Sequence, residues 1–296
     1  MIDILQAAPH VRMQRDAVIV IKVGGACLAR PAAVRAFAKQ AAVVQAFGAL
    51  PVLVHGAGPQ TGALQRTLGE EPRLVEGRRV TSPLGMRALQ MAAAGELNPA
   101  LCAALGAEGA PAVGVCGGAG GVLTARRRPP VPTSEGVIDF GEVGDLVAVD
   151  AAPLLALQSG GLIPVVCPPA GDGAGGFLNV NADLAAAAIA VALNASKLIL
   201  LTAAPGVLRD PRDPHSLLSA LSLAELDALE AEGALQDGMK VKAAAVRAAL
   251  LGGVERVHIV SGTDPYALLR ELYTNHGAGT LLTREPQCAP EEAEVA

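Results

Sequence analysis

A single lysine stands in an unusual place near the start of the chain. Lys22 ends the apolar run "AVIVIKVGGA", residues 17–26, and two glycines follow it. The run predicts a buried strand, so the ammonium group either reaches solvent along its apolar stem or faces an anion. Glycines beside it would let backbone N–H groups approach that anion closely. On this stretch alone, both interpretations stay open.

Glycine-rich turns follow three other apolar runs. They read "HGAGP" from His55, "VCGGAGG" from Val115 and "LTAAPGV" from Leu201. Parallel sheets bind ligands beyond the carboxyl ends of their strands, where these turns fall. One glycine pair is explained by a tight turn, whereas several such turns at corresponding strand ends favour a bound anion such as a phosphate.

Several common catalytic motifs are absent from the sequence. It contains no GxxxxGK[ST], so it is not a P-loop protein, and it contains no HExxH or GxSxG. The stretch "GAGPQTG" misses the GxGxxG spacing by one residue, which weakens a dinucleotide-binding interpretation.

Charged and polar residues late in the chain could share the same anion. Lys240 and Lys242 lie in "DGMKVKAAAV", at the predicted start of an Ala-rich helix. A cation there opposes the helix dipole by about 0.3–1 kcal/mol, so either both lysines are exposed or one of them reaches an anion. In "NVNADLAAAA", a helix cap or a first-turn acid explains Asp183 at least as well as a functional role does, and Asn179 and Asn181 fit ordinary turn positions.

The composition limits the class of protein. The 296 residues are 51% hydrophobic but only 2% aromatic, which favours an aliphatic core of helices packed closely on a sheet. With a net charge of −5 and no long basic block, nucleic acid is not an expected partner. Five cysteines without CxxC spacing indicate reduced thiols in a cytoplasmic protein. We expect no signal peptide and no membrane partner, because prolines and glycines break the longest uncharged stretch, residues 151–171.

Apolar runs alternate with helical patterns along most of the chain. This alternation predicts an α/β fold, with an open, mainly parallel sheet sandwiched by helices in an αβα arrangement. Residues 126–149 contain prolines, glycines and short alternating runs, which predict added β-hairpins. In "RRVTSPLGMRALQMAAAG", Thr81 or Ser82 is the predicted helix cap, Pro83 the first helical residue and Gly95 the stop.

Taken together, these motifs resemble the amino acid kinase family over residues 18–283. Within that family the chain is most similar to the branch that phosphorylates N-acetyl-L-glutamate, because of its "RRVT" and "NVNAD" elements. The matching landmarks, in order, are "IKVGGA", "LVHGAGP", "RRVT", "GELN", "FLNVNADLAAAAIAVALNASKLILLT", "PGVL", "DGMKVKAAA" and "GTDPYALLRELYTNHGAGTLL".

The resemblance implies transfer of the ATP γ-phosphoryl group to the side-chain carboxylate of N-acetyl-L-glutamate, giving N-acetylglutamyl 5-phosphate, in arginine biosynthesis. That acceptor is already an anion at neutral pH, so the reaction needs cations and N–H groups rather than a general base. The implied cofactor is ATP with Mg²⁺ held mainly by the nucleotide, without metal-binding side chains. A glycine-rich stretch near residue 170 predicts two lobes: 1–175 for the amino acid substrate and oligomerisation, and 176–296 for ATP.

The resemblance also assigns roles to individual residues. Lys22 and Lys242 would be catalytic and contact the transferred phosphoryl group, Asp183 would orient both lysines, and Lys240 has no role. The other matches are the phosphate-facing Gly24 and Gly25, the substrate-binding Gly56, Ala57, Arg79 and Asn179, and the nucleotide-binding Thr202, Gly206 and Met239.

Three alanines depart from the pattern of the family. Ala57 replaces the middle residue of a triple glycine, Ala119 a polar or acidic residue, and Ala203 a common aspartate. Because these changes bear on affinity and activity, two alternatives stay open. One is a kinase for another acylated acidic amino acid, such as an aminoadipate derivative in lysine biosynthesis. The other is a non-catalytic sensor of an amino acid or nucleotide.

Both ends of the chain suggest regulation. Residues 2–16 predict a helix that resembles the N-terminal helix of arginine-inhibited, hexameric family members. The stretch "YALLRELYTNHGAGT" resembles their arginine-site region and implicates Glu271 and Gly277. The resemblance therefore implies a homo-oligomer, a dimer or a hexamer, that arginine inhibits. A surface helix without a regulatory role is the alternative.

Overall fold

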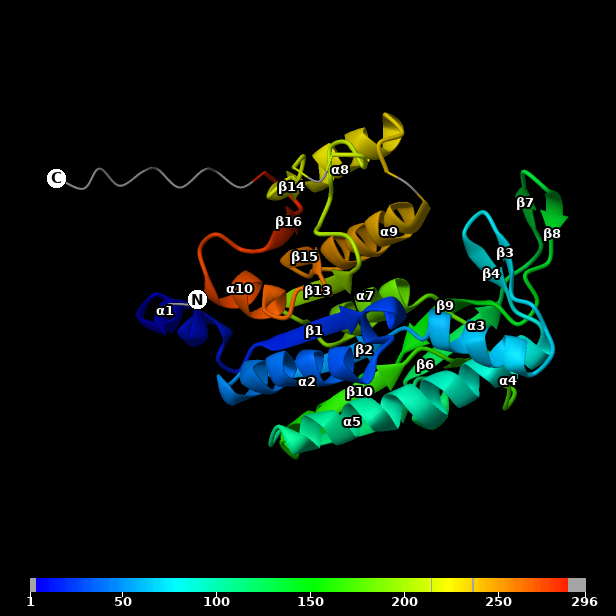
Figure 1. Cartoon of the computed structure of the whole chain (residues 1–296), viewed down its shortest axis with the longest axis horizontal. Helices are drawn as coiled ribbons and strands as arrows, with labels where there is room; N and C mark the ends of the chain where they lie inside the picture. Colours follow the sequence, from blue (N-terminus) through cyan, green and yellow to red (C-terminus); the bar gives the residue numbers. More distant parts are fainter. Residues whose placement is uncertain (1–3, 214, 236, 287–296) are drawn as a thin grey trace.

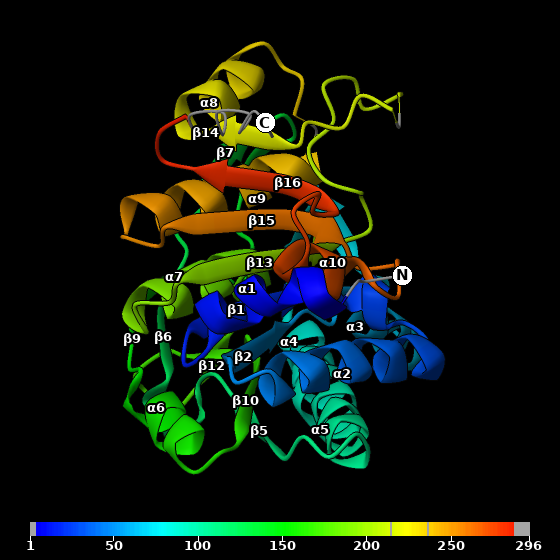
Figure 2. The same cartoon turned by 90° about the vertical axis from the view of Figure 1, so that its left-hand side faces the viewer.

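The centre of the protein is an eight-stranded β-sheet with helices packed on both faces (Figures 1 and 2). The computed structural model describes residues 4–213, 215–235 and 237–286. From one edge to the other, the strands are β14 (Ala220–Ser222), β16 (Gly279–Thr283), β15 (Arg256–Ser261), β13 (Lys197–Thr202), β1 (Val18–Val23), β2 (Leu50–His55), β10 (Ile163–Cys167) and β5 (Ala112–Cys116).

Six neighbouring strands, from β15 to β5, run parallel. Strand β1 lies among them, and its residues Ile19–Val23 pair with Lys197–Leu201 of β13. Beyond β15, strand β16 runs antiparallel and β14 follows the direction of β16. The carboxyl ends of β1, β2, β5, β10 and β13 therefore meet at one end of the sheet. The predicted α/β fold is confirmed.

The alternation of side chains along β1 decides which helices lie on which face. Ile19 and Ile21 join a buried cluster with the helices α1 (Ile4–Gln14), α2 (Pro31–Ala46), α4 (Pro83–Gln90), α5 (Asn98–Ala107) and α10 (Ala267–Tyr273). Val20 joins the cluster of the other face, with the helices α6 (Ala152–Ser159), α7 (Ala182–Ala192), α8 (Leu223–Ala231) and α9 (Asp237–Leu251). Helix α3 (Gly58–Thr67) packs against α4.

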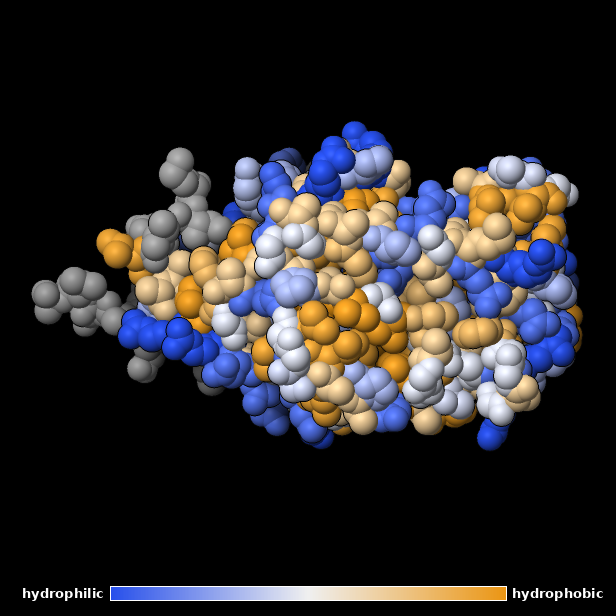
Figure 3. All heavy atoms as spheres, turned by 90° about the horizontal axis from the view of Figure 1, so that it is seen from below, coloured by the Kyte–Doolittle hydropathy of each residue, from blue (hydrophilic) through white to orange (hydrophobic). Residues whose placement is uncertain are grey.

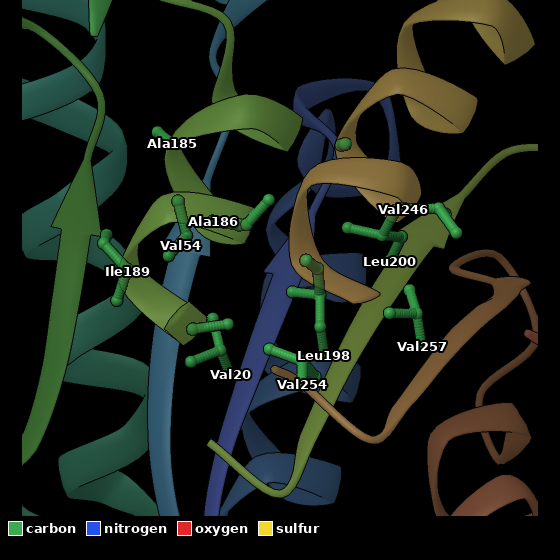
Figure 4. Close-up of a cluster of buried hydrophobic side chains, with 14 of the residues drawn as sticks. Val20, Val54, Ala185, Ala186, Ile189, Leu198, Leu200, Val246, Val254 and Val257 are labelled. Atoms are coloured by element: carbon green, nitrogen blue, oxygen red, sulfur yellow. The ribbon is translucent and has the colours of Figure 1, made fainter. Parts of the chain in front are cut away.

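The cluster around Val20 shows how an aliphatic core packs closely (Figure 4). Ala185 and Ala186 of α7 are fully buried and share the cluster with Val20 and Val54 of the sheet. Their small side chains let the backbone of α7 lie near the strands, and α9 packs beside α7 on the same face. The scarcity of aromatic residues is thus compensated by close helix-to-sheet packing.

A smaller sheet and two hairpins lie at the right of Figure 1. The small sheet contains β12 (Phe177–Leu178), β11 (Ala170–Gly171), β6 (Leu123–Arg127) and β9 (Gly144–Val149). The hairpins are β3 (Arg73–Val75) with β4 (Arg78–Val80), and β7 (Val131–Thr133) with β8 (Gly136–Ile138). The hairpins predicted within residues 126–149 are therefore confirmed.

The helix that begins at Pro83 confirms one prediction and corrects another. Ser82 is its cap, because Ser82 Oγ accepts the N–H of Gly85 at 2.9 Å. Gly95 does not end it: α4 continues through a π-helical turn, η2 (Met91–Leu97), directly into α5. The burial of Leu97 and its neighbours outweighs the cost of about 1 kcal/mol for a helical glycine. Pro99 cannot donate an α-helical hydrogen bond to the Gly95 carbonyl, and the widened turn lies just before it.

The predicted division at residue 175 does not interrupt the main sheet. Strand β1 from the first part pairs directly with β13 from the second, so the two-lobe division stays a prediction. The side of the molecule that carries α5 and β10 exposes apolar residues among hydrophilic ones (Figure 3). None of the helices in the described part of the chain has the length and hydropathy needed to cross a membrane.

Candidate active site

Lys22 points into the molecule rather than to solvent. The period of two along β1 directs Val20 and Lys22 to the same face, on which α7 packs. Only 7% of the Lys22 side chain is exposed, and its Nζ lies 2.8 Å from Asp183 Oδ1. The interpretation of Lys22 as a lysine that reaches solvent is wrong.

Asp183 can contact Lys22 because Asn181, two residues earlier, caps α7. The Asn181 side chain accepts the N–H groups of Asp183 at 2.8 Å and Leu184 at 3.2 Å, which makes Asn181 the cap of α7. Asp183 then lies in the first helical turn, with its carboxylate turned toward the sheet. The prediction of Asp183 as a first-turn acid is therefore confirmed, whereas Asn181, expected to be a turn residue, is the cap of the helix.

Lys242 reaches the same carboxylate from a different element. Its Nζ lies 3.4 Å from Asp183 Oδ2, and 13% of its side chain is exposed. Helix α9 begins at Asp237, so Lys242 lies in its second turn and not at its start as predicted. At about 100° per residue, Lys240 lies about 200° around α9 from Lys242, and its side chain is exposed.

The charges of this cluster are set by its burial and geometry. Burial alone would raise the pKa of Asp183, but the ammonium groups of Lys22 and Lys242 hold it below its ordinary value. The carboxylate is therefore ionised at neutral pH, and the three groups together carry one net positive charge. Each ammonium has three N–H donors, so donation to Asp183 leaves donors on both lysines for a bound anion.

The first glycine turn creates space beside Lys22. Gly24 donates its N–H to the Leu201 carbonyl at 3.1 Å, so that N–H belongs to the sheet and not to an anion site. A Cβ on Gly24 would meet no protein atom closer than 3.6 Å and would lie 3.9 Å from Lys22 Nζ. Gly24 therefore leaves room next to the ammonium group, although the fold itself does not require glycine there.

Gly25 and Gly56 hold the first two turns together. A Cβ on Gly25 would lie 2.9 Å from the Gly56 carbonyl oxygen and 3.0 Å from Ala57 Cα. Gly56 donates its N–H to the Val23 carbonyl at 3.0 Å. These glycines permit close approach of the turn after β2 to the short 3₁₀ helix η1 (Gly25–Leu28).

Ala57 fits its place in the turn without strain. It precedes α3 with φ −138°, a conformation open to any L-residue, and only 3% of it is exposed. The added methyl group packs in the core cluster of α2. The left-handed backbone that favours glycine is not used here, so the departure from a triple glycine leaves the turn intact.

A buried polar pair beneath this turn was missed in the sequence. Asn98 Nδ2 donates to His55 Nε2 at 3.0 Å and to the Val165 carbonyl at 2.8 Å. Burial lowers the pKa of His55 to about 4, so the ring is neutral at physiological pH and its Nε2 is an acceptor. A Cβ on Gly114 would lie 2.0 Å from Asn98 Oδ1, which explains glycine in β5. The landmark "GELN" contained the signal, because it ends in Asn98.

Arg79 and Asn179 lie on the side of β3 and β4. Arg79 donates to Gln65 Oε1 and to the Gly58 carbonyl, both at 3.0 Å, which fixes the guanidinium against α3. Partial burial and the nearby Arg66 lower the pKa of Arg79 below its ordinary value. Asn179 Nδ2 donates to Thr81 Oγ1 at 3.0 Å, two residues from Arg79 along the chain. Asn179 is thereby linked to the segment that carries Arg79.

The predicted nucleotide residues line a mostly apolar cavity of about 350 Å³. Thr202 and Met239 lie in its wall together with Ala203, and Lys242 links it to the charged cluster. Gly206 also lines it, and a Cβ there would lie 2.6 Å from Thr280 Oγ1, so close packing requires glycine.

Residues 17–261 match the profile described as the amino acid kinase family. The chain belongs to this family. The family resemblance seen in the sequence is therefore confirmed.

Curated relatives within the family are similar over almost the whole chain. The acetylglutamate kinase of Myxococcus xanthus is 44% identical over 285 residues, covering 94% of this chain and 92% of the relative. The acetylglutamate kinase of Symbiobacterium thermophilum is 40% identical, covering 94% of this chain and 96% of that protein.

Solved structures share the family fold. The N-acetylglutamate synthase of Neisseria gonorrhoeae, complexed with coenzyme A and N-acetyl-glutamate, aligns with a TM-score of 0.82 at 30% identity. The alignment covers 96% of this chain but spans only 63% of the synthase. The carbamate kinase of Giardia lamblia bound to AMP-PNP aligns with a TM-score of 0.67 at 20% identity, which shows the fold alone.

The residues predicted to form an arginine site in this family member lie apart from the cluster, around α10. Burial would raise the pKa of Glu271, but the His258 ring at 2.6 Å and the N–H groups of Ala278 and Gly279 hold it below its ordinary value. Gly277 has φ +61°, and a Cβ there would lie 2.9 Å from Glu271 Oε2. The structure brings Glu271 and Gly277 together, while arginine binding stays a prediction.

Proposed function

We propose that the protein transfers the γ-phosphoryl group of ATP to the side-chain carboxylate of N-acetyl-L-glutamate, giving N-acetylglutamyl 5-phosphate for arginine biosynthesis in the cytoplasm. The observation that carries this proposal is the pair of ammonium groups, Lys22 and Lys242, held on one buried carboxylate, Asp183. The similarity to two acetylglutamate kinases over more than nine-tenths of the chain supports the choice of acceptor.

The reaction must bring two anions together. In our proposal the acceptor carboxylate attacks the γ-phosphorus directly, since it already carries a negative charge and needs no base. Lys22 and Lys242 turn their remaining N–H donors to the equatorial oxygens of the transferred group. Asp183 holds both side chains in place before substrates bind, so no rotamer freedom is lost at that moment.

The protein residues provide the substrate side of this geometry. Arg79 is fixed by Gln65 and the Gly58 carbonyl, and its other N–H groups suit a bidentate contact with the carboxylate that does not react. Asn179 lies beside Thr81 on the same side and supplies amide groups to the acyl-amino end. In our proposal, the turn that contains Gly56 and Ala57 lies against the reacting carboxylate of the substrate.

The nucleotide would occupy the cavity lined by Thr202, Gly206 and Met239. Within the described residues, no group of three or more His, Cys, Asp or Glu side chains is arranged to hold a metal ion. Asp183, the acid of the cluster, is committed to two lysines. We therefore assign Mg²⁺ to the phosphate oxygens of ATP, where it would reduce their negative charge.

We also propose a homo-oligomer that arginine inhibits. Helix α1 packs on α10, with His10 Nε2 and Asn275 Oδ1 2.9 Å apart. A mostly apolar cavity of about 570 Å³, lined by Val11, Phe47 and Tyr273, lies between α1, α2 and α10. Light scattering measures the molar mass of the wild type and of Val11→Arg in solution. We expect the substitution to weaken the assembly and so to lower the measured mass.

One coupled assay tests the main proposal. ADP release is measured with Mg²⁺ and ATP, offering N-acetyl-L-glutamate, glutamate, aspartate and N-acetyl-aminoadipate in turn. Turnover with N-acetyl-L-glutamate alone supports the proposal, and a preference for N-acetyl-aminoadipate replaces it with the lysine-type kinase. If no acceptor is turned over, the kinase proposal is rejected and the non-catalytic sensor becomes the better explanation. Arginine added at millimolar concentration tests the inhibition, and a flat response rejects it.

A further inference from the structure

Two cysteines face each other across neighbouring strands at the edge of the main sheet. Cys116 of β5 is the direct parallel partner of Cys167 of β10. Paired strands lie about 4.8 Å apart, and paired residues direct their side chains to the same face. Disulfides usually join Cα atoms about 4.4–6.8 Å apart. The two sulfurs can therefore be bridged while the sheet keeps its pairing.

The two thiols differ in access. Cys116 is half-buried on the edge strand, whereas Cys167 has no exposed surface. A small oxidant therefore reaches Cys116 before Cys167. The buried Cys167 sulfur lies next to Cys116 and can react with it once Cys116 is oxidised. This order of an accessible thiol in front of a buried one is the arrangement found at oxidisable pairs.

The surroundings of Cys116 favour its thiolate. A hydrogen bond from the Cys167 thiol lowers the pKa of Cys116 to about 6, against the effect of burial, and the N–H groups of Gly118 and Ala119 add to the lowering. The same contact with Cys116 and burial raise the pKa of Cys167. The Cys116 sulfur also lies 3.9 Å from the Pro169 carbonyl oxygen. By contrast, burial raises the pKa of Cys102 and of Cys27.

We propose that Cys116 and Cys167 form a reversible, oxidisable dithiol that closes to an intrachain disulfide when a peroxide is present. The Cys116 thiolate attacks one peroxide oxygen and breaks the O–O bond, giving a sulfenic acid and hydroxide. The Cys167 sulfur then attacks the Cys116 sulfur, and the sulfenic hydroxyl group leaves as water with the Cys167 proton. In sum, two thiols lose two electrons and two protons, and the peroxide becomes two waters.

The position of the pair connects it to the substrate side. Gly117 donates its N–H to the Cys167 carbonyl at 2.9 Å, and Gly118 donates to the Pro169 carbonyl at 2.7 Å. A Cβ on Gly118 would lie 2.7 Å from the Phe177 ring, two residues before Asn179. A new bond between the strands alters this packed turn. We therefore expect the disulfide to raise KM for N-acetyl-L-glutamate, an effect that rests on the proposed function, and to leave KM for ATP within about twofold.

The disulfide itself is tested without any assay of activity. The reduced full-length protein is treated with hydrogen peroxide at pH 7, free thiols are blocked, and tryptic peptides are mapped by mass spectrometry. A Cys102→Ser background is used because Cys102 and Cys116 otherwise lie in the same tryptic peptide. We expect a linked Cys116–Cys167 pair that dithiothreitol reopens. Unmodified cysteines, or oxidation that stops at sulfinic acid, would overturn the proposal.

Matched variants separate the two thiols. Cys167→Ala should accumulate a sulfenic acid at Cys116 that dimedone traps, and Cys116→Ser should form no link, while circular dichroism checks that both fold. Without oxidant, we expect Cys116 to react with iodoacetamide at least about tenfold faster than Cys102. Equal rates would contradict the proposal. If the link forms while KM for N-acetyl-L-glutamate is unchanged, the dithiol stands and its effect on the substrate side is rejected.

Discussion

Lys22 Nζ lies 2.8 Å from Asp183 Oδ1, and each side chain is only 7% exposed. The contact joins the central strand β1 to the first turn of α7, and Lys242 of α9 reaches the second carboxylate oxygen. A buried carboxylate between two cations needs both of them, because either lysine alone would leave part of its desolvation uncompensated. The same arrangement presents a net positive charge at the end of the sheet where the glycine turns meet.

Replacing Lys242 by alanine tests the second cation. We expect kcat to fall by at least about 100-fold, because one source of charge stabilisation in the transition state is lost. Lys240→Ala is the matched control, since it removes the same charge from an exposed position two residues earlier on α9. Steady-state ADP release is measured for both variants and their kcat values are compared. Equal losses would mean that the net charge of α9 matters rather than the contact with Asp183.

Replacing Asp183 by asparagine tests the centre of the cluster. We expect a loss of about 3 kcal/mol in the free energy of unfolding, because two largely buried cations lose their shared counter-charge. Urea denaturation measures this loss. Asn181→Ala is the control: it removes the cap of α7 but leaves the ion pairs, at a cost of about 1 kcal/mol. A fall in kcat for Asp183→Asn that Asn181→Ala lacks would separate catalysis from stability.

The sequence pattern predicted the fold well, because the fold class follows from hydrophobic patterns within short segments of the chain. Apolar runs alternating with helices suffice for a parallel sheet, and the glycine turns marked the end of the sheet at which Lys22, Asp183 and Lys242 meet. The partners of Asp183 are different: Lys242 lies 59 residues away, and only packing of α9 on α7 brings the two together. The family resemblance supplied that pairing, whereas the pair of His55 and Asn98, which links a strand end to a helix 43 residues later, was missed.

Alanine at two adjacent glycines separates packing from function. Gly25→Ala should lower the melting temperature, because its Cβ would lie 2.9 Å from the Gly56 carbonyl oxygen. Gly24→Ala should fold almost as stably as the wild type, since its Cβ would make only ordinary contacts. We nevertheless expect Gly24→Ala to lose at least about tenfold in kcat/KM for ATP, because the methyl group fills the space beside Lys22. Scanning calorimetry and initial rates measure the two effects, and full activity of Gly24→Ala would contradict the phosphate-facing role.

Arg79→Lys tests the substrate side. A lysine keeps the charge but cannot donate in the planar, bidentate manner of a guanidinium. We expect KM for N-acetyl-L-glutamate to rise at least about tenfold, with KM for ATP nearly unchanged. Arg78→Lys is the control, because Arg78 is the exposed neighbour on the same strand. If both variants behaved like the wild type, the assigned contact between Arg79 and a substrate carboxylate would be wrong.

His55 gives the protein a specific dependence of stability on pH. Burial lowers its pKa to about 4 in the folded protein, from 6.5 when the ring is free. Between these values the unfolded chain binds more protons, so stability is complete above pH 6.5 and is lost as the pH falls toward 4. The loss from this one residue reaches about 3 kcal/mol. His55→Gln keeps an acceptor for Asn98 but does not titrate, and the other four histidines are common to both proteins. Urea denaturation from pH 7 to 4.5 should therefore show the wild type losing its advantage over His55→Gln, and parallel curves would reject the buried neutral ring as the cause.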